Sequence, residues 1–501
     1  MPYAEMGDLQ KRGEQADTFA KLTLITKRAR KEPECQFTSL AHLLNEGYLE
    51  ACYMKLGRDR ASGIDDVTWR GYGQELGKNL EDLVARLKVK RYKPQPSKRV
   101  YIPKDEHTKR PLGLPALEDK IVQKGIAGIL EAIYEADFLD CSYGYRPGRD
   151  CHQAINAVDK TIMTEPVNHV IEADIKGFFD NVSHEWLLKF LQVRIKDPSL
   201  LLLIRRMLKA GYVEAGMREA TEQGTPQGGN LSPMLANVFL HYVLDLWFEK
   251  EVKPQMEGKC WMVRYADDFV CMVQKAEDAR HIKQLLEERL TQFDLEAHPE
   301  KTRVLSFGRY ERENSERQNR KPNTFDFLGY THYCGKSRKG KFIVSRTTSH
   351  EKFRKKIKEL NAWLKAVRNM VKTKEWWPIL AAKLRGHYQY YGISGNMPAL
   401  KRYHTKSLRL ARKWLNRRSQ RKVYGWEGFR EYLRRYPLPE PRITCNLYTL
   451  SPVTGGLPKS RMWETHKSGS VRGIEVPHRV EYCDTLRTER VEKRGTQTKP
   501  K

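Results

Sequence analysis

A pair of acidic residues interrupts two apolar runs between Trp261 and Val273, where the chain reads Trp-Met-Val-Arg-Tyr-Ala-Asp-Asp-Phe-Val-Cys-Met-Val. Such runs around a short polar interruption predict two strands joined by a tight turn at Ala266, Asp267 and Asp268. Like charges held together on a rigid turn repel each other unless cations lie between them and a substrate. The chain must therefore fold around a hairpin that presents two carboxylates, either as a cation site or as a solvated turn.

An Asp-Asp pair alone is weak evidence, because Asp65-Asp66 is a second such pair in the same chain. A third carboxylate favours the cation site at Asp267-Asp268. Asp174 lies in the apolar strand predicted from His169 to Ile175 and is followed by Lys-Gly-Phe-Phe-Asp after the isoleucine. Three carboxylates at strand ends of one sheet can hold two Mg²⁺ ions, which activate a 3′-hydroxyl and stabilise a leaving pyrophosphate.

The surrounding pattern predicts an α+β fold, a sheet with helices packed on one face. Helical spacing is found at residues 20 to 57, 119 to 133, 185 to 195 and 232 to 248, the last beginning with Ser232-Pro233 as a cap and first turn. Between Arg99 and Leu114, two short strands joined by a basic loop are predicted.

Beyond Thr347 the pattern becomes helical and basic. Apolar residues recur every three or four positions and lysines and arginines fill the other faces. A charged helix face is usually only solvated, but charges of nearly one sign favour nucleic-acid binding. Residues 441 to 501 lose periodicity and turn polar, which predicts a loosely ordered tail.

The net charge indicates the kind of partner. The chain has 91 Lys and Arg against 62 Asp and Glu, a formal charge of +29, which favours a polyanion such as nucleic acid. An anionic membrane is the alternative, but the sequence has no long apolar span. The N-terminus has no apolar stretch and the nine cysteines form no Cys-x-x-Cys pair, so we expect a reducing cytosol, no zinc site and no disulfide framework.

Several motifs of the sequence resemble those of a known family. Tyr265-Ala-Asp-Asp268 resembles the signature of reverse transcriptases, and Asp174 matches the earlier metal aspartate of their palm. Further matching segments follow in the family's order: Ala61–Asp65, Arg99–Lys104, Arg110–Gly113, Ser142–Gly148, Gly224–Gly229, Leu231–Pro233, His298–Thr302 and Phe325–Gly329. Together they cover roughly residues 36 to 345, and they resemble bacterial group II intron reverse transcriptases rather than retroviral ones.

The resemblance implies a fold and a division into domains. The fold is the α+β right-hand polymerase fold, with fingers and palm on an antiparallel sheet, followed by an α-helical thumb, the maturase domain X. The implied domains are an N-terminal extension (1-35), fingers and palm (36-345), the thumb (346-440) and a basic polar tail, disordered or nucleic-acid-binding (441-501). The tail lacks the Cys/His cluster of the family's nuclease, so second-strand cleavage is not expected.

The resemblance also assigns the catalytic chemistry. Asp174 and Asp267 would be metal ligands, with Asp268 completing or tuning the site and Ile175 included beside them. The cofactor would be two Mg²⁺ ions, for which Mn²⁺ can substitute. Lys301 matches a lysine that would protonate the leaving pyrophosphate; a surface lysine is the alternative interpretation.

Substrate contacts are implied at further positions. Phe179 matches the aromatic gate that excludes a 2′-hydroxyl, with ordinary core packing as the alternative. Gln227 would lie against the incoming nucleotide. Lys104 and Arg110 would grip the triphosphate, unless they are solvated surface charges. The primer grip would comprise Phe325, Leu328 and Gly329.

The implied activity is that of an RNA-directed DNA polymerase (EC 2.7.7.49). It would bind group II intron RNA, assist its splicing and copy it into cDNA by target-primed reverse transcription. Its partners would be an RNA template/DNA primer duplex, target DNA and dNTPs, in the bacterial cytoplasm, associated with nucleoid or ribonucleoprotein. A splicing-only maturase and a domesticated enzyme of DNA repair or phage defence are the alternatives; Asp174, Asp267, Asp268 and Gln227 favour the active enzyme. The sequence leaves the oligomeric state open.

Overall fold

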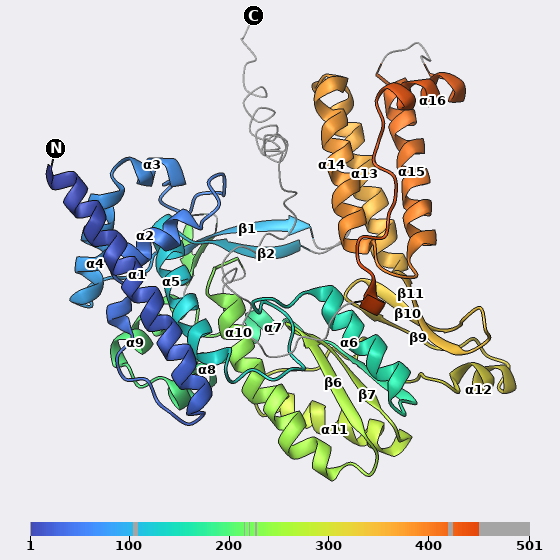
Figure 1. Cartoon of the computed structure of the whole chain (residues 1–501), viewed down its shortest axis with the longest axis horizontal. Coiled ribbons are helices and arrows are strands. Elements are labelled where there is room, and N and C mark those ends of the chain that lie inside the picture. The colour runs from blue at the N-terminus through green and yellow to red at the C-terminus, as the bar shows by residue number, and fades with distance from the viewer. Residues whose placement is uncertain are drawn as a thin grey trace, which may run out of the picture. The chain divides into compact units, whose positions relative to one another are not determined.

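The computed structural model describes residues 2–103, 109–214, 216–219, 221–225, 228–418 and 424–449 (Figure 1). Within these ranges the chain forms two compact units. The first contains the residues up to Lys355 together with Ile393–Asn396 and the segment from Cys445 onward. The second contains Lys356–Gly392 and Met397–Thr444.

A four-stranded sheet carries the acidic hairpin, and we call it the central sheet. Its order is β6 (Cys260–Tyr265), β7 (Asp268–Val273), β3 (His169–Ala173) and β8 (Arg303–Ser306), and every neighbouring pair is antiparallel. Tyr265 pairs with Asp268, so the turn has only two residues between the strands, and Ala266 takes a positive φ of 57° there. The predicted hairpin is confirmed.

Both faces of the central sheet are covered. Alternate strand residues point to opposite faces, and those on one face, including Ile171, Ala173, Phe269 and Cys271, join the large core. Val270 and Met272 point the other way and are also buried. That side has α6 (Cys151–Thr164) beside β6 and β7, and β9 (Thr324–Phe327) beside β3 and β7. The prediction that helices pack on only one face of the sheet was therefore wrong. A sheet that is buried on both faces needs elements packed against each of them.

The first unit contains further helices, among which α11 (Ala276–Thr291) contacts β3, β7 and β8 of the central sheet. The helices are α1 (Pro2–Lys31), α2 (Glu46–Met54), α3 (Trp69–Gln74), α4 (Leu76–Lys88), α5 (Leu117–Tyr134), α7 (Phe178–Asn181), α8 (His184–Arg194), α9 (Pro198–Leu208), α10 (Ser232–Leu240), α11 (Ala276–Thr291) and α12 (Glu311–Arg317). None of the helices in the described ranges is long and apolar enough to cross a membrane.

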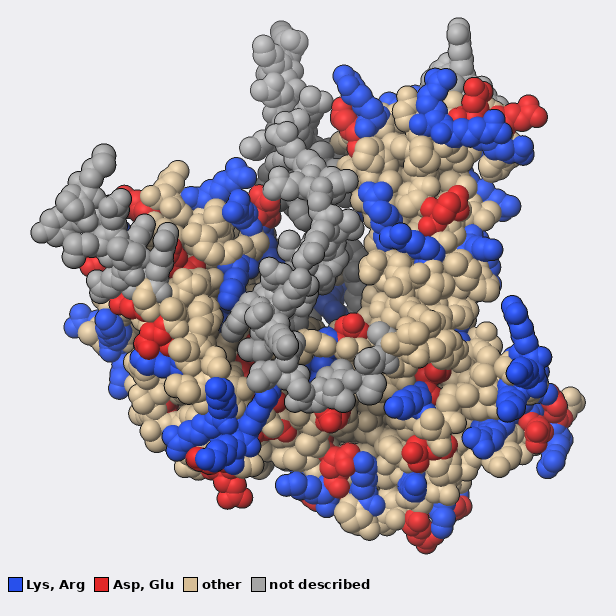
Figure 2. All heavy atoms as spheres, viewed as in Figure 1, with Lys and Arg blue, Asp and Glu red and all other residues tan. Residues whose placement is uncertain are grey.

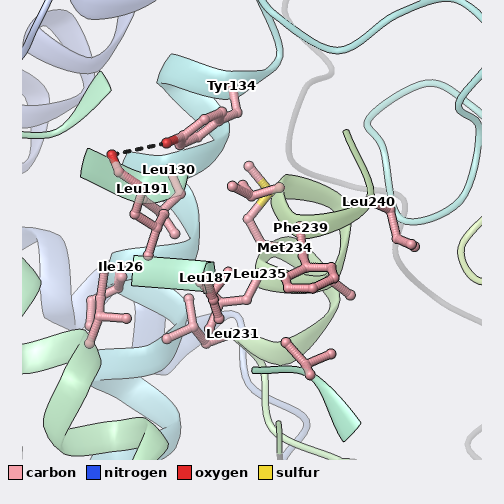
Figure 3. Packing of buried hydrophobic residues seen from close by; sticks show 14 of the residues in the cluster. Ile126, Leu130, Tyr134, Leu187, Leu191, Leu231, Met234, Leu235, Phe239 and Leu240 are labelled. Carbon is pink, nitrogen blue, oxygen red and sulfur yellow. Dashed lines mark hydrogen bonds between the residues drawn. The ribbon is translucent and has the colours of Figure 1, made fainter. Parts of the chain in front are cut away.

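The large core lies where α5, α8 and α10 meet (Figure 3). Ile126, Leu130 and Tyr134 from α5 face leucines of α8 and α10, all buried. The Tyr134 hydroxyl donates to the Leu191 carbonyl at 3.2 Å, so its polar end is satisfied inside the core. Burial of each side chain of this size stabilises the folded chain by about 1.5–3 kcal/mol. This packing holds α10 in its position against α5 and α8.

The helix predicted from Ser232 to Phe248 differs in detail. Ser232 is the first helical residue and Leu231 occupies the cap, while Pro233 lies in the first turn as predicted. The α-helix ends at Leu240, and wider π-helical segments follow at His241–Asp245 and Phe248–Val252. The first of these segments carries Asp245, which pairs with Arg264 of β6.

A second sheet has the order β2-β1-β4-β5, formed by β1 (Ser97–Pro103), β2 (Lys109–Leu114), β4 (Tyr212–Glu214) and β5 (Met217–Glu219). The predicted pair β1 and β2 is confirmed and is antiparallel. However, β1 pairs with β4 in parallel, Ser97 opposite Tyr212. A segment distant in the sequence thus adds one parallel pairing to an otherwise antiparallel sheet.

A third sheet, of order β11-β10-β9, comprises β9 (Thr324–Phe327), β10 (Tyr330–Lys336) and β11 (Phe342–Thr348). It encloses His332, whose ring is fully buried and stacks on Phe325 at 4.7 Å between centroids. Burial, and then the charge of Arg346, lowers the pKa of His332 to about 3. The ring is therefore neutral in the folded chain at any pH above this value.

Replacing His332 with Phe should weaken the dependence of stability on acid. Below pH 6.5 the unfolded wild-type chain binds a proton at this residue that the folded chain cannot, so stability is lost as the pH falls from 6.5 toward 3. Between pH 7.5 and 5 this costs wild type about 2 kcal/mol, and the variant nothing. Urea unfolding of both proteins at the two pH values measures the difference. An identical loss in both would show that His332 is protonated in the fold.

The second unit is built from helices. They are α13 (His350–Met370), which begins in the first unit, α14 (Thr373–Tyr391), α15 (Met397–Asn416) and α16 (Trp426–Arg435). From residue 356 to 444 the sequence has 22 Lys and Arg against five Asp and Glu. Blue side chains accordingly predominate over these helices in Figure 2. Aromatic residues such as Trp376 and Tyr388 fill its buried interior.

The first residues of the predicted tail make defined contacts. The amide of Thr444 donates to the Gly392 carbonyl at 2.7 Å within the second unit. Cys445 pairs with Ile393 within the first. Residues 450–501 lie outside the described ranges, and for them the loosely ordered tail stays a prediction.

Candidate active site

Three carboxylates gather at one end of the central sheet. Ala173 pairs with Phe269 in the last register of β3 and β7. Extending that register by one residue brings Asp174 opposite Asp268, the first residue of β7. Asp267 precedes it in the turn. Asp174 and the Asp267-Asp268 turn, which only the family resemblance had connected, thus lie next to each other.

Burial and mutual repulsion disfavour the ionised form of two carboxylates at this end of the sheet. Loss of surrounding water, followed by the charges of Asp267 and Asp174, raises the pKa of Asp268 to about 7, although Lys301 and Lys352 oppose this rise. The pKa of Asp267 is also raised, first by burial and then by Asp174 among its charged neighbours. Carboxylates that disfavour their own ionised form in this way attract cations.

Lys301 lies in this cluster. Its Nζ is 2.6 Å from Oδ2 of Asp174, and both side chains remain partly open to solvent. The backbone segment is held there because the amide of His298 donates to the Asp174 carbonyl at 2.8 Å. The lysine therefore supplies a positive charge, and a proton donor, next to the predicted metal ligands.

The donor set fits a hard divalent cation. Carboxylate oxygens are the ligands that Mg²⁺ and Mn²⁺ prefer, and three of them with excess negative charge meet here. Across the described ranges, no three His, Cys, Asp or Glu side chains form a ready-made cage. The side chain of Ile175 is aliphatic and offers no donor atom, so only its backbone carbonyl is a potential ligand.

Arg110 and Tyr145 lie within electrostatic reach of these carboxylates. The charge of Arg110 opposes the rise in the pKa of Asp267. Partial burial, and then Asp267, raises the pKa of the Tyr145 phenol. Tyr145 belongs to the Ser142–Gly148 segment but received no role from the sequence; its positive φ of 58° now marks it as unusual. The predicted nucleotide ligands Lys104 and Gln227 lie outside the described residues.

Phe179 lies on α7 (Phe178–Asn181), which follows β3 and Asp174 in the chain. Its ring is half-buried and meets Phe178 edge to face at 5.3 Å. Its carbonyl accepts a hydrogen bond from the Thr225 amide at 2.7 Å. Gly224 has a φ of +86°, and a Cβ there would lie 2.7 Å from the Asp180 carbonyl oxygen. Gly224 and Thr225, which precede Gln227 in the chain, therefore pack against α7.

The predicted primer grip lies on the third sheet. Phe325 is fully buried, with its ring 4.8 Å from Phe307, so its side chain is a core residue that cannot touch a primer. Leu328 and Gly329 form the two-residue turn from β9 to β10, with φ values of 49° and 78°. The turn is the part of this motif that is placed for a contact with a primer, and the primer grip stays a prediction.

Comparison with known proteins places this arrangement in a class. Residues 102–332 match the family described as reverse transcriptase (RNA-dependent DNA polymerase). This range contains the central sheet and all three carboxylates. It defines a reverse transcriptase domain, and with it the right-hand polymerase fold.

Individual relatives narrow the class. The group II intron-encoded protein LtrA of Lactococcus lactis subsp. cremoris is 35% identical over 310 residues, 58% of this chain and 51% of that protein, so the chain spans about half the length of that relative. Protein YkfC of Escherichia coli K12 is 31% identical over 376 residues, 68% of this chain and 94% of that protein. Nuclear intron maturase 4 of Arabidopsis thaliana is 29% identical over 27% of this chain and 17% of its own length. The chain belongs to the group II intron reverse transcriptase and maturase family.

Proposed function

We propose that this chain is an RNA-directed DNA polymerase that also binds and helps to splice a group II intron RNA. The observation that carries the polymerase half is the meeting of Asp174, Asp267 and Asp268 at one end of the central sheet. The excess negative charge there supports a divalent cation, the kind of cofactor that reverse transcriptase domains generally use. We propose Mg²⁺ in the cell.

The residues of the chain divide the work. Bound cations would activate the primer 3′-hydroxyl and stabilise the leaving pyrophosphate. Asp174 and Asp267 hold them, and Asp268 completes the negative site. Lys301, at 2.6 Å from Asp174, is placed to release that carboxylate to a cation and give its proton to the pyrophosphate. Arg110 contributes positive charge for the triphosphate.

The RNA-binding half rests on the second unit, which we propose to be the thumb and maturase domain. An excess of 22 basic over five acidic residues suits a polyanion. Its Arg-aromatic contacts, such as Arg412 over the ring of Trp426 at 4.1 Å, are of the kind used for stacking and backbone contacts in RNA recognition. The names of the relatives LtrA and nuclear intron maturase 4 support an intron RNA as the ligand.

Primer extension tests the proposal. The purified chain is given an RNA template, an annealed DNA primer, dNTPs and Mg²⁺. Full-length cDNA that disappears with EDTA is expected. Binding of intron RNA without any cDNA would reduce the chain to a splicing-only maturase. If cDNA forms, we further expect the chain to use target DNA as a primer, as part of a bacterial ribonucleoprotein.

Replacing Phe179 with Ala should relax the choice of sugar. A ring at this position leaves no room for a 2′-hydroxyl, so removing it should raise the use of ribonucleotides relative to deoxynucleotides roughly tenfold or more. The ratio of kcat/KM values for dNTP and rNTP measures this. Phe190→Ala, at a half-buried ring of α8, is the matched control and should keep the wild-type ratio. If the Phe179→Ala variant keeps the wild-type ratio, as the control should, Phe179 is not the residue that excludes the 2′-hydroxyl.

A further inference from the structure

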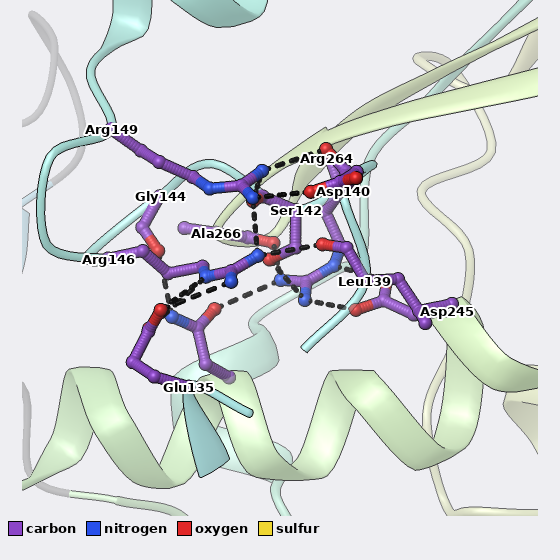
Figure 4. Close-up of polar contacts among 11 residues, drawn as sticks. Glu135, Leu139, Asp140, Ser142, Gly144, Arg146, Arg149, Asp245, Arg264 and Ala266 are labelled. Carbon is purple, nitrogen blue, oxygen red and sulfur yellow. Dashed lines mark hydrogen bonds and ion pairs between the residues drawn. The ribbon is translucent and has the colours of Figure 1, made fainter. Parts of the chain in front are cut away.

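The buried guanidinium of Arg264 contacts Ala266, the residue before Asp267 in the turn (Figure 4). Arg264 of β6 and Asp245 of the π-helical segment are both fully buried, with Nη2 of Arg264 2.6 Å from Oδ2 of Asp245. The Nε of Arg264 donates to the other carboxylate oxygen at 2.7 Å. This is the bidentate geometry that gives an arginine-carboxylate pair a fixed orientation.

The remaining donors of Arg264 hold the surroundings of the turn. Its Nη1 donates to the carbonyl of Ala266 at 2.9 Å and to Oδ1 of Asn237 at 3.1 Å. Its Nη2 also donates to Oγ of Ser142 at 2.8 Å. All five N–H groups of the guanidinium therefore have acceptors, which a buried charge requires.

Ala266 is the point at which this network meets the active site. It is buried, has a φ of 57° and immediately precedes Asp267. On its other side, a Cβ on Gly144 would lie 2.3 Å from the Ala266 nitrogen, so the loop packs directly against the turn. Asn237, which binds Arg264, also donates to the Gly144 carbonyl at 2.7 Å.

The turn needs such a restraint. An alanine at positive φ is disfavoured without help from its surroundings, and Asp267 and Asp268 place two like charges next to each other and beside Asp174. Both effects favour other conformations of the turn. A guanidinium anchored by Asp245 and bound to the Ala266 carbonyl opposes them from the buried side.

We propose that Arg264 is a positioning residue that orients the Asp267-Asp268 turn toward divalent cations, with Asp245, Asn237 and Ser142 as its anchor. The inference rests on the proposed polymerase function for its consequence, and on the geometry of the network for its cause. It assigns to the basic residue of the Arg-Tyr-Ala-Asp-Asp segment a role distinct from contact with substrate.

The test separates positioning from plain stability. In the full-length double variant Arg264→Met/Asp245→Leu, apolar side chains replace the ion pair, so no buried charge is left alone, but the Ala266 carbonyl loses its donor. The matched control is Arg194→Met/Asp137→Leu. Arg194 is also buried, pairs with Asp137 at 3.0 Å and donates to the Cys35 carbonyl at 3.0 Å, away from the turn.

Thermal unfolding, binding of Mn²⁺ alone by electron paramagnetic resonance, and primer extension are measured on wild type and both variants. We expect the Arg264 double variant to bind Mn²⁺ about tenfold or more weakly and to need correspondingly more metal for extension, as for other residues that orient metal ligands. The control should bind Mn²⁺ as wild type does. A folded Arg264 variant with wild-type Mn²⁺ binding and extension overturns the inference.

Two further outcomes are informative. If the double variant does not fold, Arg264→Lys decides, because lysine keeps the charge but lacks the planar fork; weaker Mn²⁺ binding supports positioning and wild-type binding refutes it. If the wild-type chain makes no cDNA, the proposed function fails, yet weaker Mn²⁺ binding by the Arg264 variants still supports the positioning role.

Discussion

Replacing Asp267 with Asn is expected to reduce cDNA synthesis by at least about 10³-fold, because a metal ligand is lost where two cations stabilise the transition state. The substitution also removes one of three mutually repelling charges. The variant should consequently unfold at the wild-type temperature or above it, and its RNA affinity should be unchanged. Primer extension, thermal unfolding and RNA binding are measured on the same preparation.

Asp66→Asn is the matched control for this experiment. Asp66 is the second residue of the other Asp-Asp pair, with a φ of 51° and an ion pair to Lys98 at 3.6 Å. Asparagine tolerates that conformation. Wild-type synthesis by this control, together with loss at Asp267, ties the effect to the central sheet. Residual synthesis above one tenth of wild type at Asp267 would exclude that residue as a metal ligand.

The affinity for intron RNA should fall about 10³-fold or more when the salt concentration rises from 50 to 200 mM. That loss corresponds to six or more phosphate contacts with release of their counterions, which the basic excess of the second unit can supply. Filter binding over a series of KCl concentrations gives the slope of log K against log salt. A flat response would contradict electrostatic binding by this unit.

Variants locate the contacts. Changing the exposed cations Lys401, Arg402 and Arg409 of α15 to Gln should make the slope shallower by about 0.7 to 0.9 for each phosphate contact that is lost. The matched control changes Arg280 and Lys283 of α11 to Gln, where each cation already pairs with a glutamate. The control should keep the wild-type slope. Equal changes in both would mean that charge number, and not the α15 surface, sets the affinity.

Local patterns were enough to predict the acidic hairpin and its partner strand. Short apolar runs with a polar turn specify β6 and β7, and the same signal before Asp174 specifies β3. The family resemblance then indicated that the two belong together, which the register of Ala173 and Phe269 confirms. The roles of the individual site residues remain predictions.

Long-range packing was beyond reach of the same patterns. Arg264 reads in sequence as one charge in an apolar strand, and only the fold brings Asp245 to it from a distant helix. The parallel pairing of Ser97 with Tyr212 has no local signature either. Phe325 was grouped with the primer grip by motif, whereas tertiary packing buries it against Phe307. In each case a distant segment, and not local propensity, decides the environment.

The most direct test is anomalous diffraction from crystals of the chain soaked with Mn²⁺, with an RNA–DNA primer duplex that lacks the 3′-hydroxyl and a matching dNTP. We expect two manganese peaks roughly 3.5–4 Å apart, each bound by carboxylate oxygens of Asp174 and Asp267 next to the triphosphate. Peaks elsewhere, or none between these two side chains while the nucleotide is bound, would contradict the proposed metal site.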